Sequence, residues 1–278
     1  MLSLVQIKQK ILRQLGSSIF LTLFTAHLLS CQTWLSTHDE IIQSKRNFRS
    51  MEEFKTWFVF YYQNPQPEEL TNSLMFMKKN GLLDEFPEVV SMFMAQIFKS
   101  HSASVPFWTR SWANKLNEMQ WTVVIVALWM ADQNDLKQLA IQELSRLPQE
   151  KSQKMSKMFQ STSPKTFNPL HAEILHVGQV NMLWAAFSAT GDPRYIERVV
   201  ELITLFTGGS KVLQKNIGEA ALVSLAQNTL LHPAVEDYVK KAEKNHPDPT
   251  TRALIEAMMT ALAQLQSKDE QIPGAPSH

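Results

Sequence analysis

Residues 185–203 read AAFSATGDPRYIERVVELI, and this stretch decides the fold because it joins two helices through a tight corner. Small and aromatic residues end a first helix, which we expect over residues 169–189. Gly191 can adopt the left-handed backbone conformation that terminates a helix. Pro193 suits the first position of the next helix, and the Asp192 carboxylate can cap that helix. The stretch therefore predicts an α-helical hairpin.

This corner resembles the turn between the two helices of a tetratricopeptide-like repeat, with Tyr195, Val199 and Leu202 facing back toward the first helix. The Trp, Leu-Gly and Pro signature of that family does not recur here at its period of about 34 residues. Comparable corners at residues 64–65, 133–134 and 232–233 are unevenly spaced. We therefore expect an irregular, α-solenoid-like stack of antiparallel helical hairpins, with about 10–12 helices.

Signals for β-strands are scarce, which favours an all-α fold class. The chain has 8 glycines, and its 13 prolines fall between segments of helical period. The run WTVVIVALWMA at residues 121–131 is too short to cross a membrane. Its β-branched residues 123–126 would also suit a strand, but no partner strand is evident nearby. We predict a central helix that is buried on every side.

Caps and breakers place the remaining helices. Ser50 and Glu53 form a capping-box pattern, in which the Ser50 hydroxyl accepts from the Glu53 amide and the Glu53 carboxylate accepts from the Ser50 amide. Gly81 can end a helix in the left-handed conformation. Further helices are expected over residues 50–62, 68–80, 87–99, 105–112, 135–147, 148–160, 220–231, 234–245 and 250–265.

Segments without helical period divide the chain. Residues 161–168 are rich in Ser, Thr, Pro and Lys, and they predict a loop between an N-terminal helical half, 50–160, and a C-terminal helical-repeat half, 169–266. Residues 267–278 have no apolar stripe, so we expect a disordered tail.

The N-terminal segment has the features of an export signal. Three basic residues precede a short apolar run at residues 19–29, and the first thirty-one residues contain no acidic residue. Leu28-Leu29-Ser30-Cys31 resembles the lipobox of bacterial lipoprotein precursors. The resemblance implies that residues 1–30 are a signal peptide, that Cys31 is lipidated, and that residues 31–49 are an anchor and linker.

Two alternatives for the N-terminal segment remain open. Cys31 could be an ordinary buried cysteine in a first helix over residues 2–34, or the segment could be an uncleaved signal anchor. As the chain's single cysteine, Cys31 can form no internal disulfide. Gln32 follows it instead of the aspartate that resembles an inner-membrane retention signal, which favours the periplasmic side of the outer membrane over the inner membrane.

The charge distribution argues against nucleic acid as a partner. The chain has 27 basic and 26 acidic residues, and the densest basic runs, 151–157 and 240–244, lie at helical spacing among acidic residues and glutamines. Binding to phosphates requires clustered Lys and Arg. We therefore expect solvated helix faces at these runs.

Motifs for catalysis are absent from the sequence, including nucleophile elbows, phosphate loops, dinucleotide fingerprints and paired cysteines. Two Glu-x-x-His pairs, Glu173 with His176 and Glu243 with His246, have the spacing that di-iron helical bundles use. They are weak candidates for a metal site, and chance is the alternative explanation. We therefore predict no metal, no cofactor and no enzymatic activity.

Aromatic residues are the remaining candidates for a binding site: Trp57, Tyr61, Tyr62, Trp108 and Trp112. The alternative is that these rings form core layers between stacked helices. Together the features predict an exported lipoprotein, held at the membrane by its lipid anchor, whose helices bind or scaffold an envelope protein or peptide. The alternative function is an exported enzyme whose site is assembled from distant helices, with the two Glu-x-x-His pairs as its possible metal site.

Overall fold

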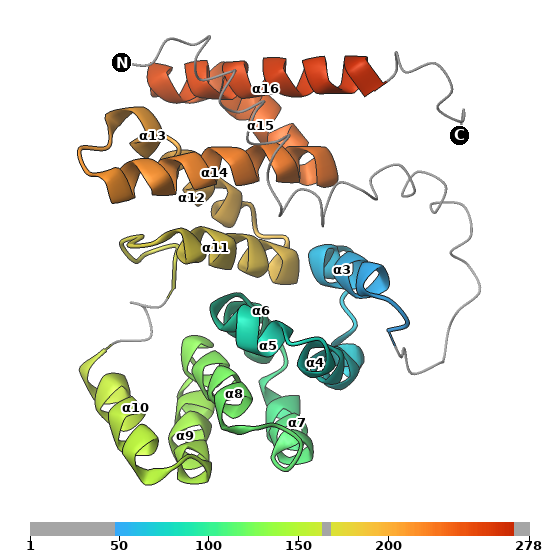
Figure 1. Cartoon of the computed structure of the whole chain (residues 1–278), viewed down its shortest axis with the longest axis vertical. Helices are drawn as coiled ribbons and strands as arrows, with labels where there is room; N and C mark the ends of the chain where they lie inside the picture. Colours follow the sequence, from blue (N-terminus) through green and yellow to red (C-terminus); the bar gives the residue numbers. More distant parts are fainter. Residues whose placement is uncertain (1–47, 163–167, 270–278) are drawn as a thin grey trace. The chain divides into compact units, whose positions relative to one another are not determined.

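The computed structural model describes residues 48–162 and 168–269, and no strand occurs in these two ranges (Figure 1). The all-α prediction is therefore confirmed. The predicted signal peptide, Cys31, most of the linker, residues 163–167 of the predicted loop and residues 270–278 of the tail lie outside the described residues.

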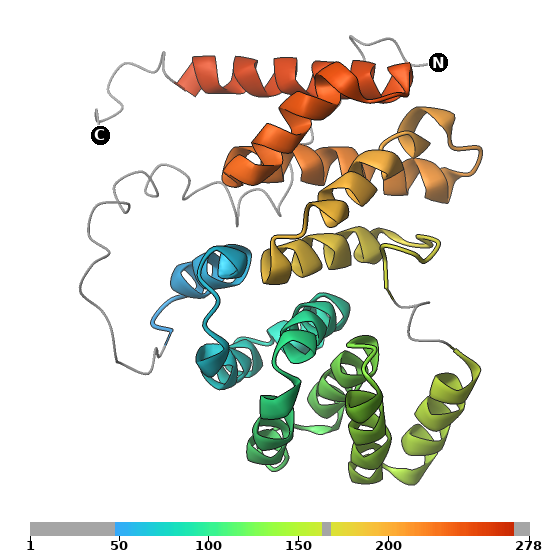
Figure 2. The ribbon, with the colours of Figure 1, turned by 180° about the vertical axis from the view of Figure 1, so that it is seen from behind.

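The chain divides into two compact units. Among the described residues, the N-terminal unit extends to Arg198 and the C-terminal unit begins at Val199. The predicted halves, 50–160 and 169–266, do not coincide with these units. The reason is that α11 (Val177–Thr190) packs along α6 (Pro87–Ser100) and so belongs with the N-terminal unit, as Figure 2 shows from behind.

Helices and single turns follow one another through both units. The N-terminal unit contains α3 (Met51–Val59), η3 (Tyr61–Gln63), η4 (Pro67–Glu69), α4 (Leu70–Lys79), α5 (Leu82–Glu85), α6, η5 (Ser102–Ser104), α7 (Val105–Trp112), α8 (Glu118–Met130), α9 (Asn134–Glu143), η6 (Leu144–Arg146), α10 (Gln149–Ser161), α11 and the start of α12 (Pro193–Leu202). The C-terminal unit contains the end of α12, α13 (Leu205–Gly208), α14 (Val212–Leu231), α15 (Pro233–Asn245) and α16 (Pro249–Asp269). These described ranges hold more helices than the ten to twelve expected, because α5 and α13 are single-turn helices of four residues.

Helix α8 forms the predicted central buried helix. Within residues 121–131 only Thr122 and Val126 are partly exposed. The Asn117 side chain accepts from the Gln120 amide at 2.9 Å, and the Gln120 side chain accepts from the Asn117 amide at 3.2 Å, which closes a capping box. Helices α6 and α9 cover α8, so its β-branched residues pack between helices and not within a sheet.

Local signals placed several helix ends correctly. The Ser50 hydroxyl accepts from the Glu53 amide at 3.1 Å as predicted, and the Glu53 carboxylate accepts from the Arg49 amide at 2.8 Å. Gly81 has a φ of 74° and Gly191 a φ of 68°, so both have the predicted left-handed conformation.

Other boundaries differ from the prediction. Helix α11 begins at Val177 and not at residue 169, because the Gln179 side chain accepts from the amides of Leu175 and His176 and thereby caps the helix there. Helix α14 begins eight residues before the predicted start at residue 220, and α13 was not predicted. Helix α16 extends to Asp269, so the first three residues of the predicted tail are helical.

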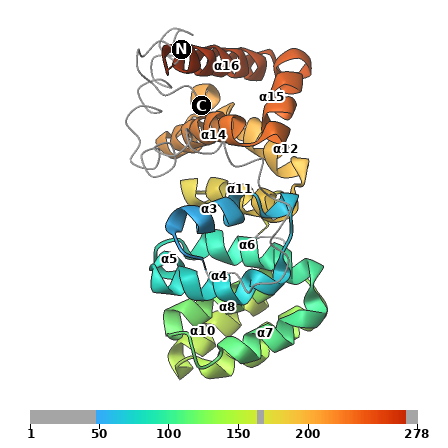
Figure 3. The same cartoon turned by 90° about the vertical axis from the view of Figure 1, so that its right-hand side faces the viewer.

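The C-terminal unit is a set of successively packed helices. Helix α13 packs against α14. Helix α15 contacts both α14 and α16 (Figure 3). Asp248 caps α16 by accepting from the Thr251 amide at 2.9 Å and from the Thr251 hydroxyl at 2.7 Å. Apolar residues from the last three helices, including Leu225, Val235 and Met258, are fully buried and form the core of this unit.

Candidate binding surface

The predicted binding aromatics of α3 and η3 lie in the core. Trp57 is 5% exposed and Tyr61 is 3% exposed. Both rings meet Phe93 of α6 edge to face, with centroid separations of 5.7 Å and 5.4 Å. Tyr62 is half-buried, and its ring centroid lies 5.0 Å from that of Phe187 in α11. These residues form an aromatic layer between helices, which was the alternative interpretation.

Two buried polar atoms in this layer stand out. Within the described ranges, the indole nitrogen of Trp57 and the hydroxyl of Tyr61 have no hydrogen-bond partner. Burial raises the pKa of the Tyr61 hydroxyl, and the nearby Glu68 carboxylate raises it further, so this hydroxyl stays protonated. The layer is held by apolar and aromatic contacts, and these two buried polar atoms are not accessible to a ligand from solvent.

The predicted aromatics of α7 are also core residues. Trp108 is 7% exposed and Trp112 is fully buried, and their rings lie parallel with centroids 6.4 Å apart. The Trp112 indole nitrogen donates to the Thr71 hydroxyl of α4 at 3.1 Å, and its ring stacks on Phe98 of α6 at 6.2 Å. The two tryptophans therefore fix α7 to α4 and α6.

The outward face of α7 carries an aromatic residue that the binding prediction omitted. Phe107 is 70% exposed. The buried residues Val105, Trp108 and Trp112 recur at helical spacing, and Phe107 lies about 100° from Trp108 around the helix. This period was present in the sequence and could have identified Phe107 as the exposed ring of α7.

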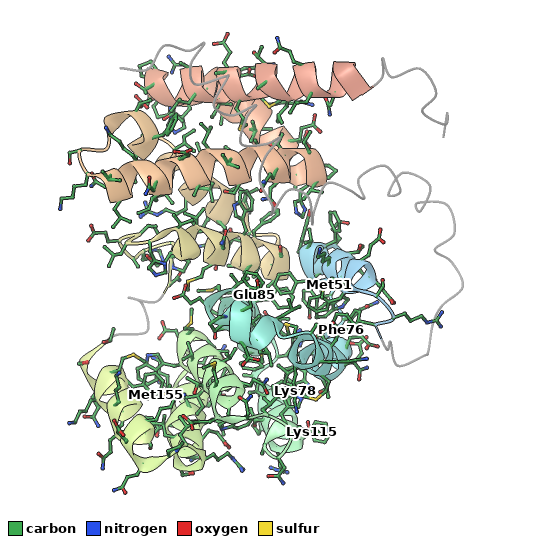
Figure 4. The ribbon with its side chains drawn as sticks, viewed as in Figure 1. Met51, Phe76, Lys78, Glu85, Lys115 and Met155 are labelled. Atoms are coloured by element: carbon green, nitrogen blue, oxygen red, sulfur yellow. The ribbon has the colours of Figure 1, made fainter. Side chains whose placement is uncertain are left out.

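Basic residues surround Phe107 along the chain. The sequence between Glu88 and Glu118 contains no acidic residue, whereas it contains Arg110 and Lys115, which are exposed. The Lys78 ammonium at the end of α4 donates to the backbone carbonyl of Lys115, and Figure 4 shows these two residues together below α4. We call Phe107, Arg110, Lys115 and Lys78 the α7 surface.

Two acidic residues of the N-terminal unit, Asp84 and Glu118, have partners of their own. The Asp84 carboxylate accepts from the Gln120 side chain at 3.1 Å, and the Glu118 carboxylate forms an ion pair with Lys151 at 3.1 Å. Lys151 offsets the negative charge of Glu118, whereas Asp84 keeps its charge because the Gln120 side chain is neutral. The α7 surface therefore combines an exposed aromatic ring with three basic side chains.

The two Glu-x-x-His pairs do not lie wholly within helices, as the spacing of di-iron helical bundles would require. His176 precedes α11 and His246 follows α15, so neither pair lies on one helical face. The His176 imidazole is 3.9 Å from the Glu88 carboxylate, and the His246 ring accepts from the Asp248 amide at 3.2 Å. Across residues 48–162 and 168–269, no group of three or more His, Cys, Asp or Glu side chains is arranged to bind a metal ion.

Comparison of the chain with known protein families, with curated proteins and with solved structures finds no match. Within the described part of the chain, none of the helices has the length and apolar character needed to cross a membrane.

Proposed function

We propose that this chain is an exported lipoprotein, anchored through Cys31, whose helical N-terminal unit binds an acidic segment of another envelope protein or peptide. The observation that carries the binding proposal is the 70% exposure of Phe107 on a surface rich in basic residues. The lipobox-like Leu28-Leu29-Ser30-Cys31 supports the anchor.

The α7 surface has the composition of a binding hot spot. Aromatic residues and Arg dominate the energetics of protein interfaces, and Phe107 and Arg110 are one helical turn apart. Burial of an exposed Phe side chain contributes about 1.5–3 kcal/mol. Because Trp108 and Trp112 hold α7 in place, little ordering of the helix would accompany binding.

The basic side chains define the expected partner. Arg110, Lys115 and Lys78 favour carboxylates, and Arg can bind a carboxylate through two parallel hydrogen bonds. The partner segment should therefore carry Asp or Glu residues beside an apolar residue that covers Phe107. Long-range attraction between the two charged surfaces would raise the association rate at low salt.

Photocrosslinking in the intact cell tests the binding proposal. A photoreactive phenylalanine analogue replaces Phe107, and a matched control places it at Ile141, which is 45% exposed on α9. We expect a crosslinked partner from position 107 alone, lost with Arg110→Glu and partly retained with Arg110→Lys. Equal products from both positions, or products unaffected by Arg110→Glu, would contradict the proposal.

Fractionation tests the anchor separately. Cys31→Ser should release the protein from the membrane fraction and leave the precursor uncut, because several acyl chains hold a protein domain at a membrane through about 0.8 kcal/mol per buried methylene. Unchanged membrane retention of Cys31→Ser would exclude lipidation as the anchor.

A further inference from the structure

The turn that leads into α14 exposes two neighbouring apolar side chains. Val212 is 76% exposed, the highest value among the large apolar residues that the structure describes, and Leu213 is 49% exposed. Both belong to the first turn of α14, directly after the short helix α13 (Figure 1). We call residues 210–215 the α14 tip.

The α14 tip is fixed by hydrogen bonds. The Gln214 side-chain oxygen accepts from the Ser210 amide at 3.0 Å, from the Ser210 hydroxyl at 3.2 Å and from the Lys211 amide at 3.3 Å. These bonds satisfy amide groups at the start of α14 that the helix itself leaves open. The tip is therefore an ordered structure that keeps Val212 and Leu213 outside the core.

Two glycines allow the close packing beneath the tip. A Cβ atom on Gly218 would lie 2.1 Å from the backbone nitrogen of Phe206, and one on Gly209 would lie 2.5 Å from the carbonyl oxygen of Leu205. The backbones of α13 and α14 are thus in direct contact. Because α13 occupies the inner side of α14 here, Val212 and Leu213 are left facing solvent.

The residues next to the tip in the sequence carry charge of one sign. Lys211 and Lys215 are exposed on either side of the apolar pair, and the sequence from residue 202 to residue 218 contains no acidic residue. Exposed aliphatic side chains beside lysines suit a membrane surface, where the apolar groups enter the headgroup region and the ammonium groups approach phosphates. Val and Leu are under-represented in protein hot spots, so a lipid surface fits this pair better than a protein partner.

We infer that the α14 tip is a second membrane contact, at which Val212 and Leu213 insert between the headgroups of anionic phospholipids and Lys211 and Lys215 bind their phosphates. The inference rests on the proposed function, because the anchor keeps the tip close to a membrane. Contact at the tip would fix which face of the C-terminal unit meets the membrane.

Site-specific fluorescence tests the inference with the full-length chain. Cys31 is the only cysteine, so Cys31→Ser with Val212→Cys gives one thiol for an environment-sensitive probe. The labelled chain is mixed with vesicles of phosphatidylcholine alone or with added phosphatidylglycerol. We expect the probe to shift to shorter wavelength and to be quenched by spin-labelled lipid in the anionic vesicles. A matched chain labelled through Ile141→Cys should show neither effect.

Charge variants measure the electrostatic part of the contact. Lys211→Glu and Lys215→Glu should each weaken the probe response at least fivefold, since a lysine near an anionic membrane contributes roughly a factor of five in affinity. Leu213→Asp should abolish the response. Circular dichroism of each variant checks that the helices are intact.

The outcomes separate this inference from the anchor. Cosedimentation of the lipidated chain with membranes, compared with Cys31→Ser, reports on the anchor alone, whereas the probe at residue 212 reports on the tip alone. If the emission of the probe at residue 212 still indicates water when anionic vesicles are present, the inference is overturned, whether or not Cys31 anchors the protein. Equal responses at residues 212 and 141, or a shift that depends on protein concentration without lipid, would also overturn it.

Discussion

Gly191 and Gly81 form a matched pair that separates backbone strain from steric overlap. Gly191 has a φ of 68° and Gly81 a φ of 74°, so alanine at either position would be forced into the left-handed conformation. This conformation costs an L-residue about 1–2 kcal/mol, and the smaller entropy of the unfolded alanine chain offsets about 0.4–1 kcal/mol. Gly81→Ala should therefore lower the free energy of unfolding by about 1 kcal/mol.

Gly191 carries an additional steric constraint. A Cβ at Gly191 would lie 2.7 Å from Cδ2 of the Tyr62 ring, whereas a Cβ at Gly81 would meet no atom within 4 Å. Tyr62 cannot move freely, because its ring packs 5.0 Å from that of Phe187. Overpacking of this kind costs about 1–3 kcal/mol, so Gly191→Ala should destabilise the N-terminal unit by about 2–4 kcal/mol in total.

Urea titration and thermal melts monitored by circular dichroism measure both variants in the full-length chain. The expected result is a loss for Gly191→Ala that exceeds the loss for Gly81→Ala by about 1–3 kcal/mol. In a Tyr62→Ala background the excess should disappear, because the clashing ring is gone. Equal losses at the two glycines, or an excess that persists without Tyr62, would refute the steric argument.

Three further predictions concern stability. In denaturant titrations, Trp112→Ala should lower the free energy of unfolding by about 3–5 kcal/mol and Phe107→Ala by less than about 0.5 kcal/mol, because Trp112 is fully buried whereas Phe107 is 70% exposed. Similar losses for the two variants would contradict the assignment of Trp112 to the core. Asp192→Ala should destabilise by about 1 kcal/mol, because the Asp192 carboxylate caps α12 by accepting from the Arg194 amide at 3.0 Å; an unchanged melting temperature would exclude the cap. Burial lowers the pKa of His232 from 6.5 to about 4, so the unfolded chain binds a proton more readily than the folded chain, and the free energy of unfolding should fall as the pH drops from 6.5 toward 4. His232→Gln should make the melting temperature less dependent on pH across that range, and an unchanged dependence would contradict the argument.

Sequence reasoning was most accurate where short-range signals determine the backbone. The Ser50 hydroxyl accepts from the Glu53 amide, and Gly81 and Gly191 take left-handed conformations, because a cap or a helix end depends on residues within about four positions. The sequence reasoning failed before α11, where the side chain of Gln179 starts the helix at Val177 and leaves the preceding residues irregular.

The candidate site was harder to predict because exposure depends on contacts between distant helices. The sequence left open whether Trp57 and Tyr61 lie in a core or on a surface, and their contacts with Phe93 of α6 place them in the core. The outward direction of Phe107 follows from the burial of Trp108, which could have been inferred from the helical period but was not.

The all-α class, the buried character of residues 121–131 and the corner at Gly191 could be predicted from the sequence, because these follow from apolar period, composition and local backbone preference. Only the tertiary structure decided that the compact units divide between Arg198 and Val199, that the predicted binding tryptophans are core residues, and that Val212 faces solvent. Packing of α11 on α6 and of α13 on α14 sets these outcomes. The physical reason is that a helix can be specified by its own residues, whereas the face it buries depends on which distant helix covers it.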